Sequence, residues 1–165
     1  MIKDAIVSDN QLYRYQLTRI WDTSLPLVMF ICLNPSTADH KNDDPTLLKC
    51  IKYASNWGYG GLIMGNLFAY RATEPLDMKK AKDPIGPLNN HHLKLMSNQV
   101  DKIVCGWGNH GKYLGRDEEV ISMFDKLYAM KINMTGSPAH PLYLKQLLSP
   151  IFFNSIIKVF SNDVS

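Results

Sequence analysis

The sequence of 165 residues has few cysteines and lacks the short motifs of common metal and nucleotide sites. Cys32, Cys50 and Cys105 form no C-x-x-C pair, so neither a zinc ribbon nor a disulfide framework is indicated. The five histidines include no H-x-x-x-H or H-E-x-x-H pair. A G-x-S-x-G nucleophile elbow and a phosphate loop ending in G-K-[ST] are also absent. We therefore expect no metal and no redox cofactor, and the pattern argues against a serine hydrolase.

Long apolar runs are missing as well. The longest, residues 25–33, contains Pro26 and is far shorter than the roughly 20 residues of a membrane span. The first residues have no apolar signal core, so the expected location is the cytoplasm, with no membrane partner. Charge of either sign is not in excess: 18 Lys and Arg against 15 Asp and Glu leave a net charge of +3. That value permits a nucleic-acid partner without arguing for one.

What is present is the composition of one folded domain. Hydrophobic residues make up 45% and aromatic residues 10%, which excludes a disordered chain. No repeat or linker divides residues 1–165, and we expect a monomer without an obligate protein partner. Four apolar runs predict strands, and their continuous hydrophobicity is typical of parallel strands covered on both faces. These strands are residues 27–33, 61–65, 102–105 and, more weakly, 129–134.

Helical patterns lie between the strands. Asp44 as N-cap and Pro45 at the first helical position begin one helix, and residues 87–99 and 116–128 predict two more. The order β-α-β-α-β-α-β predicts a three-layer α/β/α sandwich around a mainly parallel four-stranded sheet. Residues 13–20 alternate and could add an antiparallel edge strand. The tail after Pro150 is expected to form a packing strand or helix that ends loosely at residues 161–165.

Chemically distinctive residues follow directly after each of the four strands. In open parallel sheets, ligands bind at the carboxyl ends of the strands, so these segments should converge on one crevice. They are residues 34–37, 66–68, 106–111 and 137–141.

Asn34 begins the first of these segments. Asn-Pro at a strand end is a common turn, so a purely structural role is one interpretation. The other is that the amide orients a water or substrate, with Ser36 and backbone N–H groups near a phosphate. An amide is not a titrating base, so Asp39 is the candidate that would supply base character.

His140 lies in the last segment between Pro138 and Pro141, which stiffen its backbone. A single histidine is often structural. At a strand end beside the other segments, it could instead donate a hydrogen bond to a developing anion.

Aromatic side chains accompany the other two segments. Asn66 is followed by Phe68 and Tyr70, which could be core packing or could present an amide and a stacking ring to a base. Trp107 starts a glycine-rich stretch that also holds His110 and allows close backbone approach to a ligand.

Several of these segments resemble a bacterial and phage family catalogued as a domain of unknown function. The resemblance covers about residues 12–148 and rests on six motifs: LNPSTAD (33–39), DPT (44–46), NLFAYRAT (66–73), DPIGP (83–87), GWG (106–108) and GSPAHPLYL (136–144). It implies no activity.

The order of motifs is also similar, more distantly, to the uracil-DNA glycosylase superfamily, and the Asn-Pro motif is most similar to its mismatch-specific thymine/uracil branch. This resemblance implies that Asn34 positions the attacking water and Asn66 reads the pyrimidine edge. It further implies that His140 stabilises the leaving base, while Leu142 and Tyr143 enter the duplex. No Asp precedes Pro35 and the His140 loop continues Leu-Tyr, so a larger, modified pyrimidine is expected rather than uracil.

The sequence therefore predicts a uracil-DNA glycosylase-like fold and a DNA glycosylase that removes a flipped-out, modified pyrimidine, with a possible role in defence against foreign DNA. Asn34, His140 and Asp39 are the expected catalytic residues, and Asn66, Phe68, Tyr70 and Trp107 the expected base contacts. Two alternatives stay open: a nucleoside or nucleotide N-glycosidase or deoxyribosyltransferase, and a non-catalytic nucleic-acid or nucleotide sensor. The expected DNA contacts are Ser36, Arg71, His110, Lys112, Leu142, Tyr143 and Lys145.

Overall fold

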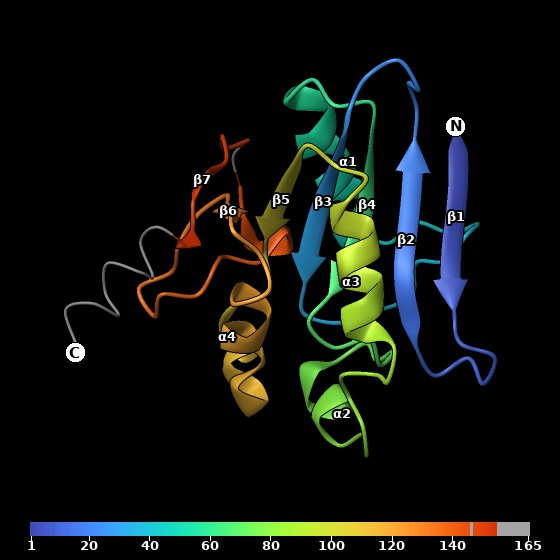
Figure 1. Cartoon of the computed structure of the whole chain (residues 1–165), viewed down its shortest axis with the longest axis vertical. Helices are drawn as coiled ribbons and strands as arrows, with labels where there is room; N and C mark the ends of the chain where they lie inside the picture. Colours follow the sequence, from blue (N-terminus) through green and yellow to red (C-terminus); the bar gives the residue numbers. More distant parts are fainter. Residues whose placement is uncertain (146, 155–165) are drawn as a thin grey trace.

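The computed structural model describes residues 1–145 and 147–154 and contains a seven-stranded sheet (Figure 1). The four central neighbours, β4, β3, β5 and β6, are all parallel, as the apolar runs predict. Antiparallel strands flank them, with β1 and β2 beyond β4 and β7 beyond β6. In chain order the strands are β1 (Ile2–Val7), β2 (Arg14–Ile20), β3 (Leu27–Cys32), β4 (Gly61–Asn66), β5 (Lys102–Cys105), β6 (Tyr128–Ala129) and β7 (Ile151–Phe152).

Helices cover both faces of this sheet, which makes the molecule a mixed α/β fold in three layers (Figure 1). Helix α1 packs against one face through Leu47, Cys50 and Tyr53. Leu93 of α3 and Val120 of α4 pack against the other. The helical elements are α1 (Pro45–Asn56), α2 (Pro75–Lys79), α3 (Asn89–Ser97), α4 (Arg116–Ile121) and the 3-10 helices η1 (Asn109–Gly115) and η2 (Pro141–Tyr143).

The sheet is larger than the four strands that the sequence predicts. Strand β2 is antiparallel as expected, but it is not the edge, because β1 pairs along its outer side. Most residues of β1 are exposed, so this strand carries no apolar run from which it could be recognised. A short strand, β7, follows Pro150, but both of its residues are exposed; the rest of the expected tail, residues 155–165, lies outside the described part of the chain.

The predicted helix over residues 116–128 ends at Ile121, and the weak strand over 129–134 shrinks to Tyr128–Ala129. Asn154 explains the early helix end. Its Nδ2 donates to the Asp125 carbonyl at 2.6 Å, and its Oδ1 accepts from the Leu127 N–H at 3.2 Å. These bonds hold the segment in a non-helical course that periodicity alone could not show.

The order of the parallel strands determines where a site can form. Strand β3 lies between β4, which follows it in the chain, and β5, which is reached only after two further helices. The chain therefore leaves β3 and β5 in opposite directions along the sheet, toward β4 and toward β6. In open α/β sheets, such a switch point opens a crevice beyond the carboxyl ends of the two diverging strands, here β3 and β5.

Candidate functional site

A pocket of about 550 Å³ opens at this switch point. Its walls come from the segments that follow β3, β4 and β5 and from the segment around His140, so residues distant in the sequence meet here. The lining comprises Leu33, Asn34, Ser36, Thr37, Asp44, Pro45, Thr46, Ala72, Thr73, Glu74, Pro75, Trp107, Gly108, Asn109, His110, Asn133, Ala139, His140, Leu142 and Tyr143.

A second, much smaller cavity of about 30 Å³ adjoins the pocket on the side of the sheet. It is lined by strand residues, among them Arg14 and Asn66. The two spaces lie on either side of shared lining residues, which are Asn34, Ser36, Asp44, Thr46 and His140.

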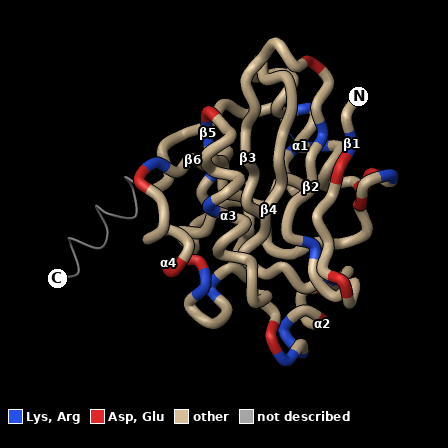
Figure 2. Tube along the Cα trace, turned by 45° about the vertical axis from the view of Figure 1, so that its right-hand side comes forward, with Lys and Arg blue, Asp and Glu red and all other residues tan. Residues whose placement is uncertain are grey.

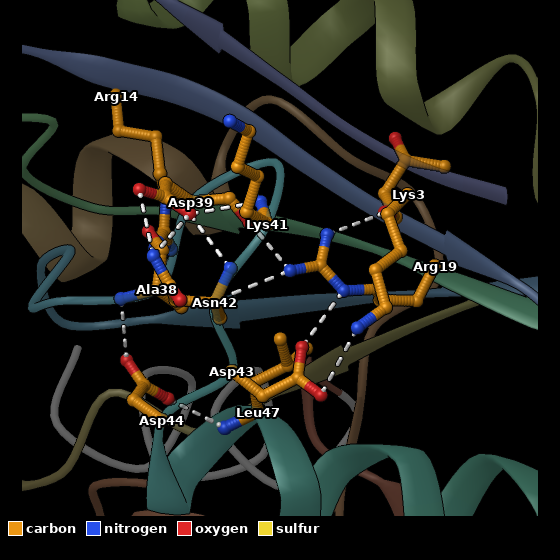
Figure 3. A network of polar contacts seen from close by, with 11 residues as sticks. Lys3, Arg14, Arg19, Ala38, Asp39, Lys41, Asn42, Asp43, Asp44 and Leu47 are labelled. Atoms are coloured by element: carbon orange, nitrogen blue, oxygen red, sulfur yellow. Dashed lines mark hydrogen bonds and ion pairs between the residues drawn. The ribbon is translucent and has the colours of Figure 1, made fainter. Parts of the chain in front are cut away.

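Two buried arginines of β2 hold the loop between β3 and α1 in place (Figure 3). Arg14 Nη1 donates to the Ala38 carbonyl at 2.8 Å. Arg19 donates from Nη2 to the Asp39 carbonyl at 2.5 Å and pairs through Nε with Asp43 at 3.0 Å. Buried carbonyls need such donors, so the conformation of this loop depends on β2 as well as on its own sequence.

Asp44 completes the support of the loop (Figure 3). Its Oδ1 accepts from the Leu47 N–H at 2.8 Å, which confirms the predicted N-cap of α1. Its Oδ2 accepts from the Ala38 N–H at 3.3 Å. Both oxygens are therefore engaged, although the carboxylate lines both spaces.

Asn34 enters the pocket with one side of its amide already engaged. Its Nδ2 donates to the Ala72 carbonyl at 2.7 Å and to the Pro35 carbonyl at 3.1 Å. These bonds assign the nitrogen and leave Oδ1 as the atom that can accept a hydrogen bond in the pocket.

Asp39 lies elsewhere. Its Oδ1 accepts from the Asn42 N–H at 2.7 Å and from the Lys41 N–H at 2.8 Å, closing a turn outside the pocket lining. Those backbone bonds lower the pKa of Asp39 to about 2. A carboxylate with so low a pKa is a weak base, and the structure gives it a turn-forming role.

His140 is held in one neutral form. Its Nδ1 accepts from the Leu142 N–H at 3.2 Å, so the ring hydrogen belongs on Nε2. Burial lowers the pKa of His140 to about 4, with Asp44 acting in the opposite direction. At neutral pH this side chain is therefore a hydrogen-bond donor without a charge.

Asn66 is the last residue of β4 and is 2% exposed. Its backbone carbonyl accepts from Asn89 Nδ2 at 2.9 Å, which ties the strand end to α3. Its own Nδ2 has no hydrogen-bond partner among the described residues, and the side chain lines the small cavity.

The predicted aromatic contacts are only partly brought together. Trp107 lines the pocket but is 1% exposed, with its ring edge-to-face against Phe153 at 5.7 Å. Phe68 is fully buried in the core and contacts the Tyr113 ring, and Tyr70 packs against Tyr13. Neither Phe68 nor Tyr70 lines the pocket or the small cavity.

The predicted DNA contacts divide in the same way. Ser36, His110, Leu142 and Tyr143 line the pocket, and Tyr143 is 80% exposed at its mouth. Three others are not among the lining residues: Arg71, whose Nη1 reaches the Gln11 carbonyl at 3.5 Å, Lys112 and Lys145.

Arg14, which lines the small cavity, is one of the lining residues that the sequence does not point to. The only available signal is a charged side chain inside an otherwise strand-like stretch, a pattern that surface strands share. Thr46, in the DPT motif, also lines both spaces without having been named as a site residue.

Within the described part of the chain, no group of three or more His, Cys, Asp or Glu side chains gathers as metal ligands. Nor is any described helix long and apolar enough to cross a membrane.

Searches of curated proteins and of solved structures return no match to this chain. A family described as "Protein of unknown function (DUF1643)" matches residues 14–142, a range that includes β2, the β3–α1 loop, Asn66, Trp107 and His140. Most of the chain and nearly all of the pocket thus fall within the match, and the protein belongs to this DUF1643 family.

Proposed function

We propose that the protein hydrolyses the N-glycosidic bond of a flipped-out pyrimidine nucleotide and is a DNA glycosylase. The observation that carries the proposal is that a neutral, partly buried His140 and Asn34 Oδ1 line the pocket, while Asn66 Nδ2, which has no partner among the described residues, lines the adjoining small cavity. These three groups match the needs of the reaction: a donor for the departing base, an acceptor for water, and an amide for the base edge.

In this reaction the bond between C1′ and the base nitrogen breaks, and its electron pair leaves with the base. The sugar passes through an oxocarbenium-like state, which water attacks at C1′ while releasing a proton to solvent. His140 Nε2–H would hydrogen-bond to the carbonyl oxygen on which the negative charge develops. Because its pKa is lowered to about 4, His140 stabilises this anion as a neutral donor rather than as an acid.

Asn34 would orient the attacking water through Oδ1, since its Nδ2 is held by Ala72. An amide removes no proton, but a cationic sugar needs only a well-placed nucleophile. In this mechanism, Asn34 therefore positions the water, and His140 stabilises the departing base.

The direct test is release of free base, measured by mass spectrometry, from DNAs that carry uracil, thymine mismatches or modified cytosines. We expect release by the wild type from at least one substrate and loss of about 100-fold or more in His140→Ala, on the scale of one removed anion-stabilising donor. His91→Ala is a matched control, because His91 is exposed on α3 and lines neither the pocket nor the small cavity. Equal release by wild type and His140→Ala would exclude the proposed role of His140.

A specific observation favours a second candidate, an N-glycosidase or deoxyribosyltransferase acting on free nucleosides or nucleotides. Among the described residues, neither Lys nor Arg lines the 550 Å³ pocket, whereas Asp44 and Glu74 do. Along the backbone, basic and acidic residues lie close to one another near α2 and α4 (Figure 2).

The charges around the pocket mouth favour a DNA substrate more than the charges of the pocket wall do. Lys79 Nζ lies 3.0 Å from His110 Nδ1, and Lys112 Nζ donates to the Thr135 carbonyl at 2.8 Å. Lys49 binds the Leu144 carbonyl beside Tyr143. Ammonium groups around the mouth suit phosphates that flank a nucleotide turned into the pocket.

Incubation with nucleosides in parallel with DNA separates the candidates. Base release from DNA alone supports the glycosylase, and release from nucleosides alone supports the monomer enzyme. Binding of nucleic acid without any released base, unchanged in Asn34→Ala and His140→Ala, would identify a sensor.

A role against foreign DNA is part of the same proposal. It predicts that cells expressing the wild type restrict phage infection and that cells expressing His140→Ala do not. Equal restriction by both proteins would exclude a catalytic defence role.

A further inference from the structure

The small cavity holds two buried hydrogen-bond donors that nothing in the described chain satisfies. Arg14 Nε and Asn66 Nδ2 both lack partners, and the two residues are 3% and 2% exposed. Both residues line the same space of about 30 Å³. Buried donors without acceptors are costly and rare in folded proteins, so two at one cavity indicate that an acceptor binds there.

The carboxylate of the cavity does not serve these donors. Both oxygens of Asp44 already accept backbone N–H groups, from Leu47 and from Ala38. Arg14 uses Nη1 for its hydrogen bond to the Ala38 carbonyl, and this bond leaves Nε without a partner among the described residues. Burial lowers the pKa of Arg14 to about 10, which leaves the guanidinium charged, and hence a donor only, at neutral pH.

We infer that this cavity binds an exocyclic oxygen of the ligand's ring, a carbonyl or a carboxylate oxygen, and that Arg14 determines specificity for it. The inference rests on the proposed function, in which a base occupies the adjoining pocket. It adds a residue from β2, outside all the segments that follow the parallel strands, and the chemical class of group that the residue reads.

The size of the small cavity and its position beside the pocket agree with this role. About 10–15 Å³ holds one water-sized atom, so a cavity of about 30 Å³ admits an exocyclic oxygen but not a ring. Because Asn34, Ser36 and His140 line both spaces, a ring in the pocket can extend an oxygen past them into the cavity.

The chemistry predicts a preference for one class of base. An amino group in the same place would direct its own N–H bonds at Arg14 and Asn66, which are donors there. Keto or carboxyl bases should therefore bind better than bases with an amino group or hydrogen in that position.

Binding of free bases to the wild type tests the inference without requiring catalysis. The probes are uracil, pyrimidine, 2-pyrimidinone, 4-pyrimidinone and 5-carboxyuracil. We expect uracil or 5-carboxyuracil to bind at least about tenfold more tightly than pyrimidine, a factor that one good hydrogen bond to a charged donor supplies. The two pyrimidinones identify which carbonyl is read, and 5-carboxyuracil separates a carboxylate from a ring carbonyl.

A matched pair of variants separates recognition from loop support. Arg14 and Arg19 are both buried in β2 and both hold the β3–α1 loop, but Arg14 alone of the two lines the cavity. Arg14→Lys should reduce the ratio of uracil to pyrimidine affinity to about one. Arg19→Lys should weaken all probes to a similar extent and keep the ratio.

Nuclear magnetic resonance gives a second readout, since the Nε–H signal of Arg14 can be assigned by its loss in Arg14→Lys. We expect this signal to shift with oxygen-bearing probes and not with pyrimidine. Affinities of uracil and of 5-carboxyuracil that both equal that of pyrimidine, a preference for the oxygen-bearing probe that is unchanged in Arg14→Lys, or an unmoved signal with every probe would overturn the inference and leave a site for water only. Selective binding without base release from DNA or nucleosides would refute the proposed reaction and leave the inference standing.

Discussion

The two walls of the pocket are built by different physical means. The first wall, residues 33–46, is held by polar contacts of charged groups: the buried Arg14 and Arg19 of β2 donate to the loop, and within the loop Asp43 and the buried Asp44 accept hydrogen bonds (Figure 3). In this wall, buried backbone carbonyls and carboxylates find donors on a neighbouring strand. Its geometry therefore depends on ionic contacts that few exchanges would preserve.

The second wall, residues 106–111 with 137–143, is held by close backbone packing. The Gly108 N–H donates to the Pro138 carbonyl at 2.8 Å, and a Cβ on Gly106 would lie only 3.0 Å from Pro141 Cδ. Glycines and prolines thus bring two loops into contact where larger or freer residues would separate them. The loop that follows Asn34 is therefore held by hydrogen bonds from charged side chains, whereas the loop that carries His140 is held by close packing, although both residues face one pocket.

The largest expected effect comes from breaking the first wall at Arg19. Arg19→Met removes the partner of Asp43 and the donors to the Thr18, Asp39 and Asn42 carbonyls. We expect the free energy of unfolding to fall by about 3–5 kcal/mol in urea denaturation, because each carbonyl left without a donor costs about 1–3 kcal/mol. Lys3→Met is the control, because the Lys3 ammonium lies 3.7 Å from the same carboxylate but is solvent-exposed. Its loss should stay within about 1 kcal/mol. Equal losses in the two variants would show that the buried network does not support this wall.

In the second wall, we expect a substitution at Gly111 to lower the free energy of unfolding most. A Cβ there would lie 2.1 Å from Trp107 Cδ1, so Gly111→Ala must displace a buried ring, and we expect a loss of about 3 kcal/mol with a changed tryptophan spectrum. Gly115→Ala is the comparison, since its Cβ meets no atom within 4 Å and only a φ of +64° opposes it. That change should cost about 1 kcal/mol. A smaller loss at 111 than at 115 would contradict the steric account.

Acid should weaken the second wall through His140. Its pKa of about 4 in the folded protein lies below the value of about 6.5 in an unfolded chain. The unfolded state then binds more protons between these values, so the stabilisation present above pH 6.5 is lost as the pH falls toward 4. Between pH 7 and 4, the wild type should lose about 2 kcal/mol more than His140→Gln, measured by urea denaturation at each pH. His92, whose pKa is also lowered by burial, is present in both proteins and cancels. Parallel pH curves would refute the assignment.

The smallest effect is expected at Asp44, where the first wall meets α1. Asp44→Ala removes the acceptor for the Leu47 N–H and should lower the free energy of unfolding by about 1 kcal/mol. Asp44→Asn retains one acceptor, for the Leu47 N–H, but loses the acceptor for the Ala38 N–H, so its loss should be smaller than that of Asp44→Ala without vanishing. If Asn proves as damaging as Ala, the charge of Asp44 matters more than its cap.

Local patterns were sufficient for the parallel core of the fold. The apolar runs predict β3, β4 and β5 because strands covered on both faces are hydrophobic throughout. The Asp44–Pro45 pair predicts the start of α1 because capping involves only neighbouring residues. Strand β1 was missed, since an exposed outer strand needs no apolar pattern.

Of the candidate site, the sequence could predict only those residues that directly follow the ends of the parallel strands. Asn34, Asn66 and His140 meet as expected because carboxyl ends of parallel strands share one edge. Phe68 was expected beside the base, but Leu67 and Phe68 continue to donate to the Cys32 and Leu33 carbonyls, and the ring is buried in the core. Phe68 stands two residues after Asn66 whether its ring stacks on a base or packs in the core, so the sequence could not distinguish these two roles.

The sequence by itself determined the parallel strands, the first helix cap and the edge of the sheet at which polar residues gather, because each depends on contacts between near neighbours. Only the tertiary structure decided that Arg14 lies beneath that edge, with its Nε lacking a partner among the described residues and Asn66 beside it in one cavity. The position of Arg14 results from the antiparallel pairing of β2 with β4, a contact between residues more than 40 positions apart. A charged side chain in a strand has the same local signature whether it faces solvent or a binding cavity.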